Sequence, residues 1–317
     1  MNKNDKIFVA GHKGLVGSAI YRKLNEKKFK NIFTASKSVL DLRNPIKVSN
    51  FIKKTKVKYI FICSAKVGGI KANNSYPAEF IYDNLMIQNN LINCAYKNNI
   101  QRLLFLGSSC IYPKINKTSL SEKDLLTGKL EPTNEPYAVS KIAGIKMCES
   151  YNRQYGTDYR SVMPTNTYGP NDKYDPENSH VLPALLQKFH NAKINKKSKV
   201  NIWGSGKALR EFIYVDDLAD ACIFLMNINK IKYQEKILPM QSHINIGSGF
   251  EVSIKKLTQI IAKIVNYKGK IIFDHKMPDG TLKKTLNSNV LNNMGFKAKT
   301  NIEEGLKKTY KNYLNEL

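Results

Sequence analysis

Residues 7–17 read IFVAGHKGLVG, an apolar run followed by three glycines within seven residues. The run predicts a short buried strand, and the amphipathic stretch over residues 15–27 predicts a helix directly after it. Glycines in such a turn let backbone N–H groups and the helix N-terminus approach a pyrophosphate, and the last one allows the helix to pack closely on the sheet. The spacing is G-x-x-G-x-x-G instead of the more common G-x-G-x-x-G. In this strand–turn–helix context it predicts a dinucleotide-binding α/β domain.

The alternation of strand and helix patterns continues along the first half of the chain. Apolar runs at residues 31–35, 59–63 and 102–106 predict strands, and residues 77–97 predict a long helix. Strands that are apolar throughout belong to parallel sheets covered on both faces. We therefore expect a doubly wound Rossmann-type parallel sheet with a smaller C-terminal lobe.

The domain boundary is expected near Pro164, because turn residues accumulate after it. Residues 1–165 are assigned to an NADP-binding Rossmann domain, and parts of residues 210–247 are expected to pack back on it. Residues 166–317 are assigned to a substrate-binding lobe. Within that lobe, Ser253 is expected to cap a helix over residues 254–265.

The composition narrows the possible partners. The 317 residues carry 51 Lys and Arg against 25 Asp and Glu, a net charge of +26. One interpretation is nucleic-acid binding, but only six of the cationic residues are arginine, and the lysines are scattered without interleaved aromatics. We expect no nucleic-acid partner, and a basic surface that attracts a phosphorylated substrate.

The cysteine, histidine and hydropathy patterns argue against a metalloprotein, a disulfide-stabilised protein and a membrane protein. The five cysteines include no C-x-x-C pair and the five histidines lack metal-ligand spacing, so we expect no metal and no disulfide framework. No stretch approaches the roughly 18 apolar residues that span a bilayer, and the N-terminal apolar run is too short for a signal peptide. The expected location is cytoplasmic, without a membrane partner.

The segment after the second expected strand bears on the cofactor. It reads Ala35-Ser36-Lys37-Ser38 and holds no acidic residue before Asp41. NAD enzymes often place a carboxylate here for the ribose hydroxyls. A lysine with two serines suits a 2′-phosphate better, so NADP is favoured. The alternative is that Lys37 is a solvated lysine of a lysine-rich chain.

A candidate catalytic set follows the fourth expected strand. Tyr137 and Lys141 stand four residues apart and share one face of a helix. The ammonium is expected to lower the pKa of the phenol toward neutrality, so that Tyr137 exchanges a proton with a carbonyl or alkoxide. Ser108 comes at the carboxyl end of its strand, where α/β sheets bind ligands. Taken alone, Ser108 could be an ordinary turn serine.

Together these features resemble the extended short-chain dehydrogenase/reductase family. Within it the chain is similar to the branch formed by the GDP-L-fucose synthases. The resemblance covers nearly the whole chain and is carried by residues 64–70 (SAKVGGI), 107–114 (GSSCIYPK), 131–137 (EPTNEPY), 148–156 (CESYNRQYG), 160–166 (RSVMPTN), 178–180 (NSH), 203–206 (WGSG), 210–212 (REF) and 278–280 (PDG).

The resemblance implies NADPH-dependent conversion of GDP-4-keto-6-deoxy-D-mannose to GDP-L-fucose. C3 and C5 are epimerised first, with Cys110 as base and His180 as acid, and the C4 ketone is then reduced with Ser108, Tyr137 and Lys141. It further implies a homodimer. The implied cofactor residues are Gly11, His12, Lys13, Gly14, Leu15, Val16, Gly17, Lys37, Leu106, Gly107, Ser108, Tyr137, Lys141, Pro164, Thr165, Asn166, Thr167 and His180. The implied GDP-sugar residues are Lys188, Trp203, Arg210 and Asp279.

Several alternatives stay open. Cys110 could be a small buried hydrophobe, His180 a structural hydrogen-bonder and Trp203 part of the core. Lys13 and Thr167 replace an expected arginine and leucine, and residues 172–175 differ around the substrate mouth. The alternative function is C4 reduction without epimerisation of a related GDP-4-keto sugar, such as a GDP-4-keto-6-deoxy-heptose. A non-catalytic cofactor sensor is a further class, but it usually lacks the full Ser/Tyr/Lys set.

Overall fold

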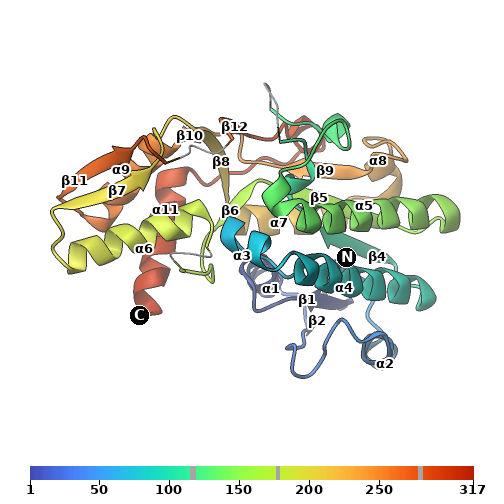
Figure 1. Ribbon diagram of the computed structural model, residues 1–317. Coiled ribbons are helices and arrows are strands. Elements are labelled where there is room, and N and C mark those ends of the chain that lie inside the picture. Colours follow the sequence, from blue (N-terminus) through green and yellow to red (C-terminus); the bar gives the residue numbers. More distant parts are fainter. Residues whose placement is uncertain (115–118, 176–178, 278–280) are drawn as a thin grey trace.

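A six-stranded parallel sheet forms the centre of the larger lobe (Figure 1). The computed structural model describes residues 1–114, 119–175, 179–277 and 281–317. The strands follow the order β2-β1-β3-β4-β5-β9. Their bounds are β1 (Lys6–Ala10), β2 (Asn31–Phe33), β3 (Tyr59–Ile62), β4 (Arg102–Leu106), β5 (Tyr159–Pro164) and β9 (His243–Ile246). The expected α/β fold with a parallel sheet is confirmed.

Helices cover both faces of this sheet. One face carries α1 (Leu15–Glu26) and α7 (Val215–Asn227), and the other carries α2 (Pro45–Thr55), α4 (Pro77–Lys97) and α5 (Glu135–Tyr155). Successive strand residues alternate between the two faces. Ile7 and Val9 of β1 enter one apolar cluster, whereas Phe8 and Ala10 enter the other. This double burial is the physical reason why the strands are apolar throughout.

The strand order places a ligand-binding edge beside the glycine turn. From β1 the chain moves outward to β2 and then returns to β3 on the other side of β1. The register pairs Ala10 with Ile62, so the turns that follow these two strands lie next to each other. In open α/β sheets the carboxyl edge at such a reversal forms a crevice that takes ligands.

The second lobe, on the left of Figure 1, has its own apolar core. Its elements are β6 (Asn166–Tyr168), α6 (Val181–Ile194), β7 (Lys199–Trp203), β8 (Leu209–Tyr214), β10 (Glu251–Ser253), α9 (Ile254–Val265), β11 (Lys270–Asp274), β12 (Lys283–Lys284) and α11 (Ile302–Asn315). The expected capped helix is confirmed, because the Ser253 side chain accepts from the Lys256 N–H at 3.1 Å.

Residues 215–246, which lie between β8 and β10 in the sequence, return to the first lobe. Helix α7 joins the apolar cluster on the central sheet, and β9 pairs with β5 at the end of that sheet. Segments α3 (Ile70–Ser75), α8 (Lys230–Gln234) and α10 (Asn289–Asn293) are short connections. Across the described ranges, no helix combines the length and the apolarity needed to cross a bilayer.

Candidate active site

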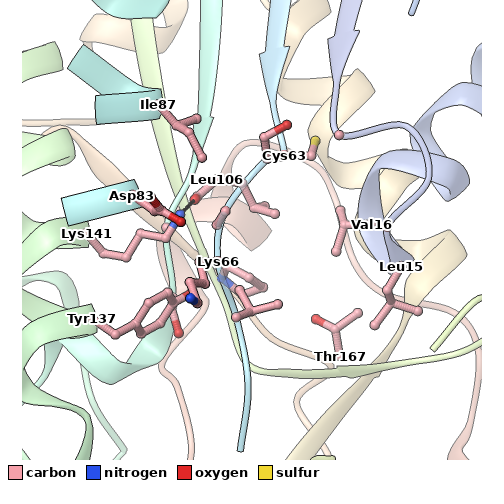
Figure 2. A pocket seen from close by; sticks show the side chains of 18 of the residues that line it. Leu15, Val16, Cys63, Lys66, Asp83, Ile87, Leu106, Tyr137, Lys141 and Thr167 are labelled. Carbon is pink, nitrogen blue, oxygen red and sulfur yellow. Dashed lines mark hydrogen bonds between the residues drawn. The ribbon is translucent and has the colours of Figure 1, made fainter. Parts of the chain in front are cut away.

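A cavity of about 630 Å³ lies at the carboxyl edge of the sheet, beside the turns after β1 and β3. Figure 2 shows Tyr137 and Lys141 entering it from one side, and Leu15 and Val16 of α1 on the other. All five proposed catalytic residues line this cavity: Ser108, Cys110, Tyr137, Lys141 and His180. The proposed cofactor residues also line it, apart from Gly17. One continuous cleft therefore brings together predicted residues from six separate parts of the sequence.

The glycine turn is shaped for close backbone approach. Gly11 has φ of 88°, and a Cβ added there would lie 2.7 Å from the Ser64 backbone nitrogen. Gly17 does not line the cavity. A Cβ there would lie 2.1 Å from the Gly11 carbonyl oxygen, so only glycine lets α1 pack this closely against the turn.

The start of α1 suits an anion. Its N-cap residue, Gly14, supplies no side-chain cap, and the first helical turn carries no acidic residue. The buried Nδ1 of His12 in the same turn has no hydrogen-bond partner. Open N–H groups at a helix N-terminus favour a pyrophosphate. The residues present therefore fit a dinucleotide.

Gly17→Ala is expected to weaken NADPH binding at least tenfold. The added methyl group clashes with the Gly11 carbonyl, which is backbone and cannot swing aside, so the turn must open. Fluorescence titration with NADPH checks this. Gly156→Ala is a control for backbone strain without a clash: Gly156 has φ of 64° at the C-cap of α5, but a Cβ there meets no atom within 4 Å, so this variant should lose some stability and keep its NADPH affinity. Equal affinities of the two variants would contradict the role of Gly17.

The serine, phenol and ammonium converge from two elements. Ser108 follows β4, whereas Tyr137 and Lys141 lie in the first turns of α5. The Lys141 ammonium donates to the Leu106 carbonyl at 2.9 Å and lies 5.8 Å from the centroid of the Tyr137 ring. A hydrogen bond with the Ser108 side chain also acts on the Tyr137 phenol. These contacts hold the three groups at one end of the cleft.

The protonation of this set differs from the sequence-based expectation. Burial raises the pKa of Tyr137, although proximity of Lys141 was expected to lower it. Burial also lowers the pKa of Lys141 to about 8. The ammonium lies over the ring and donates to a backbone carbonyl, so its charge does little for the phenol oxygen. The expectation is wrong for the free protein, and Tyr137 is a protonated phenol at neutral pH.

Cys110 has a polar environment. Its sulfur lies 3.4 Å from Asn134 Nδ2 and 3.6 Å from Lys284 Nζ. These donors, together with its position in the cavity wall, distinguish it from a small buried hydrophobe. A neighbouring ammonium stabilises negative charge on a sulfur.

His180 stands at the N-cap position of α6 and is exposed toward the cavity. Desolvation by the surrounding walls lowers its pKa, and the Lys284 charge lowers it further. The imidazole is therefore mostly neutral at pH 7, with a polar ring directed to the same space as Cys110.

Lys284 was missed by the sequence analysis. It lies on β12, paired in register with Arg210 of β8, and lines the cavity. The adjoining chain is fixed by Glu211, whose carboxylate accepts from the Leu286 N–H at 2.8 Å. One lysine among many carries no local signal, and only its proximity in sequence to the motif at residues 278–280 pointed to this region.

Two groups of cavity residues were also not assigned from sequence. Cys63, Ser64, Ala65, Lys66 and Val67 follow β3, and they overlap a segment that carried the family resemblance. Ser36, Leu40, Asp41, Leu42 and Arg43 follow β2, opposite Asp83 and Ile87 of α4. The strand ends themselves were the available signal for both groups.

Three of the proposed sugar residues, Lys188, Trp203 and Arg210, lie outside the wall of this cavity. The Lys188 ammonium donates to the Asn201 carbonyl at 2.5 Å. Trp203 is 67% exposed, so the alternative that it belongs to the core is wrong. Arg210 Nη1 donates to the Thr281 carbonyl at 2.7 Å and adjoins the cavity through its strand neighbour Lys284. Asp279 lies outside the described residues.

A metal centre finds no support in the part of the chain that the structure describes. Within it, no group of three or more His, Cys, Asp or Glu side chains is arranged to hold an ion.

Comparison with known proteins identifies relatives over the full length. The GDP-L-fucose synthase of Escherichia coli K12 is 50% identical over 98% of this chain and 96% of its own length. GDP-L-fucose synthase 1 of Arabidopsis thaliana is also 50% identical, over 99% of this chain and 94% of its own. A Campylobacter jejuni GDP-D-glycero-L-gluco-heptose synthase, crystallised in the presence of NADPH, superposes with a TM-score of 0.93 at 36% identity, covering 99% of each chain.

The sequence profile of the NAD dependent epimerase/dehydratase family matches residues 7–247. These residues contain the glycine turn, the strand-end serine and the tyrosine–lysine pair described above. The chain therefore belongs to the NAD dependent epimerase/dehydratase family of extended short-chain dehydrogenases/reductases.

Proposed function

We propose that this protein converts GDP-4-keto-6-deoxy-D-mannose to GDP-L-fucose, using NADPH, by epimerisation at C3 and C5 followed by reduction at C4. The observation that carries the proposal is the meeting of two chemical sets in one cleft. Ser108, Tyr137 and Lys141 suit ketone reduction, and Cys110 with His180 suits proton exchange beside the ketone. The 50% identity to GDP-L-fucose synthases over nearly the whole chain supports this substrate.

The glycine turn and the N-terminus of α1 would hold the pyrophosphate of NADPH. When bound, NADPH supplies the hydride that C4 receives. The residues that follow β2, Lys37 among them, would hold the adenosine half. The nicotinamide half would lie against the residues that follow β5: Pro164, Thr165, Asn166 and Thr167. Thr165 and Asn166 are fixed by their side chains, which both donate to the Glu211 carbonyl.

The reduction needs a proton for the C4 oxygen. Tyr137 is that donor, since its raised pKa keeps the phenol protonated until negative charge develops on the oxygen. Ser108 donates a second hydrogen bond to the same oxygen and orients the ketone. Lys141, anchored to the Leu106 carbonyl, lies over the Tyr137 ring, 5.8 Å from its centroid, and helps to fix that ring in the cleft.

The epimerisation uses the acidity of carbons next to a ketone. Cys110 removes a proton from C3 or C5 as a thiolate, which the Lys284 ammonium at 3.6 Å stabilises. His180 returns a proton on the opposite face of the carbon from its protonated form, which is the minor form at pH 7 because its pKa is lowered. The epimerisations at C3 and at C5 both pass through an enolate. Its oxygen is the C4 oxygen that Ser108 and Tyr137 also bind during reduction, so one site serves epimerisation and reduction.

The second candidate is a C4 reductase that leaves epimerisation to another enzyme. The fold similarity to the C. jejuni GDP-heptose synthase favours it, as does the altered segment at residues 172–175. The presence of Cys110 and His180 in the cleft favours the first proposal.

The direct test adds GDP-4-keto-6-deoxy-D-mannose to the protein with NADPH. The expected result is a loss of NADPH fluorescence that follows sugar concentration, with GDP-L-fucose identified by NMR. Oxidation of NADPH only with a heptose-derived ketone would instead establish the second candidate.

Lys37→Ala is expected to lower the preference for NADPH over NADH by about 10- to 100-fold, because a charge-assisted hydrogen bond to the 2′-phosphate contributes roughly 1.5–3 kcal/mol. The affinity for NADH, which lacks this phosphate, should stay the same. Parallel fluorescence titrations measure both affinities. An equal loss for the two cofactors, or none, would show that Lys37 is only a solvated residue.

We also propose a domain boundary, a homodimer and a cellular location. The boundary near residue 165 separates a cofactor lobe from a sugar lobe, as the third apolar cluster suggests. A homodimer is supported by exposed Tyr82, Val139 and Tyr155 on α4 and α5. The location is proposed to be cytoplasmic, and the basic surface is proposed to attract the GDP group in place of nucleic acid.

A further inference from the structure

The contact between Cys110 and Lys284 joins two distant segments of the chain. The Lys284 ammonium lies 3.6 Å from the Cys110 sulfur, across 174 residues of sequence. Cys110 follows β4 without lying in the strand, and Lys284 ends β12, a strand of two residues. Neither element alone fixes the distance between the sulfur and the ammonium. A further connection between the two segments is needed to hold it.

Asn245 of β9 provides this connection. Its side chain is fully buried, and its polar contacts come from different parts of the chain. Oδ1 accepts a hydrogen bond from the Tyr112 hydroxyl at 2.6 Å. Nδ2 donates to the Leu120 carbonyl at 3.1 Å and to the Asn287 carbonyl at 3.2 Å. We call this group, made of Asn245, Tyr112, Leu120 and Asn287, the Asn245 junction.

The Asn245 junction lies next to both reactive groups in sequence. Tyr112 follows Cys110 by two residues, and Asn287 follows Lys284 by three. Over so few residues the backbone carries a displacement from one position to the other. Asn245 therefore sets how the turn with Cys110 stands against the strand with Lys284.

Backbone hydrogen bonds complete the Lys284 side of the junction. The Leu120 N–H donates to the Thr285 carbonyl at 2.9 Å, and the Asn287 N–H donates to the Leu120 carbonyl at 2.7 Å. These contacts hold residues 285–287 beside Leu120. On the Cys110 side the link is a single side-chain group, the Tyr112 hydroxyl, so this is the bond to test.

Each group in the junction has one hydrogen-bonding role. Both partners of Asn245 Nδ2 are carbonyls, which only accept, so the amide oxygen must face Tyr112. Burial raises the pKa of Tyr112, so its hydroxyl keeps the proton that it donates to Oδ1. Burial lowers the pKa of His243 to about 4, so the imidazole is neutral, and its Nε2 donates to the Tyr112 oxygen at 3.1 Å. A buried network with fixed roles has one arrangement, as a positioning device requires.

We propose that Tyr112 and Asn245 are positioning residues, which hold the Cys110 sulfur against the Lys284 ammonium. Neither side chain lines the cleft, so both act through Cys110 and Lys284. The inference rests on the proposed role of Cys110 as the base of epimerisation. A thiolate is the reactive form of a cysteine, and a neighbouring ammonium stabilises it.

Tyr112→Phe tests the link, because it removes the hydroxyl and keeps the buried ring. The first measurement is the rate at which iodoacetamide alkylates Cys110 in the free protein, followed by mass spectrometry. We expect alkylation to be about tenfold slower, since the attacking thiolate loses part of its ammonium contact. The second measurement is deuterium exchange at C3 and C5 of GDP-4-keto-6-deoxy-D-mannose, which should slow by about 10- to 100-fold. The NADPH affinity should not change.

Tyr59→Phe is the matched control. Tyr59 is also buried, and its hydroxyl donates to an amide oxygen, Gln101 Oε1, at 2.9 Å. It begins β3, at the amino edge of the sheet, whereas the cleft lies at the carboxyl edge. This variant should keep both rates, and thermal melting compares the stability that each variant loses. Equal slowing in both variants would show a general loosening of the fold and would count against the proposal.

A double variant separates positioning from general loosening. Lys284→Met should itself slow the alkylation of Cys110, and adding Tyr112→Phe should change that rate by less than about twofold, because no ammonium is left to position. Losses that multiply would overturn the proposal, as would unchanged or faster alkylation in Tyr112→Phe alone. Absence of deuterium exchange in the unmodified protein would instead remove the proposed epimerisation, and the alkylation rates would then decide whether Tyr112 positions Cys110.

Discussion

Tyr137→Phe is expected to lower the rate of C4 reduction by about 10²- to 10⁴-fold, the usual contribution of a positioned general acid. The phenol is protonated, hydrogen-bonds with the Ser108 side chain and has the Lys141 ammonium 5.8 Å from its ring centroid. Without its hydroxyl, the developing alkoxide keeps one hydrogen bond, from Ser108, and receives no proton. The ring itself is retained, so its edge contact with Phe80, at 6.4 Å between centroids, should persist.

The measurement is single-turnover oxidation of NADPH with saturating sugar, alongside an NADPH titration that should be unchanged. Tyr155→Phe is a matched control, because it removes a phenol hydroxyl from the same helix at an exposed position. It should reduce the ketone at the normal rate. If Tyr137→Phe retained full activity, the proton would have to come from another group, and the assignment of the cleft would fail.

Much of the first lobe could be predicted from sequence, because its signals are local. The expected strand at residues 7–10 is β1 (Lys6–Ala10), and the expected helix at residues 77–97 is α4 with the same bounds. The glycine spacing, the apolar runs and the strand-end position of Ser108 all lie within a few residues of the feature they define. Helix α2 was missed although its signal was present: Asn44 accepts from the Lys47 N–H as N-cap, and Pro45 occupies the first turn.

The rest of the cleft depends on contacts between distant segments. Lys284 lies 174 residues along the chain from Cys110. It reaches that cysteine only because β12 pairs with β8. Arg43 meets Asp83 only because α4 packs beside the loop after β2. The pKa of Tyr137 also follows from burial, and spacing to Lys141 cannot report burial. Pairing and desolvation are properties of the folded chain, and no short motif encodes them.

Cys110→Ala is expected to lower deuterium exchange at C3 and C5 of the sugar by about 10²- to 10⁴-fold, while C4 reduction continues. The experiment incubates GDP-4-keto-6-deoxy-D-mannose with the protein in D₂O without NADPH, and NMR follows the label. The physical reason is that the thiolate is the base for both carbons and the Lys284 ammonium at 3.6 Å stabilises it. Tyr137, Ser108 and Lys141 are untouched, so the variant should still oxidise NADPH and yield an alcohol with unchanged C3 and C5.

Cys63→Ser provides the matched control, since Cys63 also lines the cleft but burial raises its pKa to about 12, which keeps it a thiol. Exchange should continue in this variant, because an unionised thiol cannot act as the base. If the unmodified protein left C3 and C5 protiated with both mannose- and heptose-derived ketones, the cleft would be that of a reductase only. Cys110 would then be a bystander whose polar neighbours serve the sugar, and the second candidate function would stand.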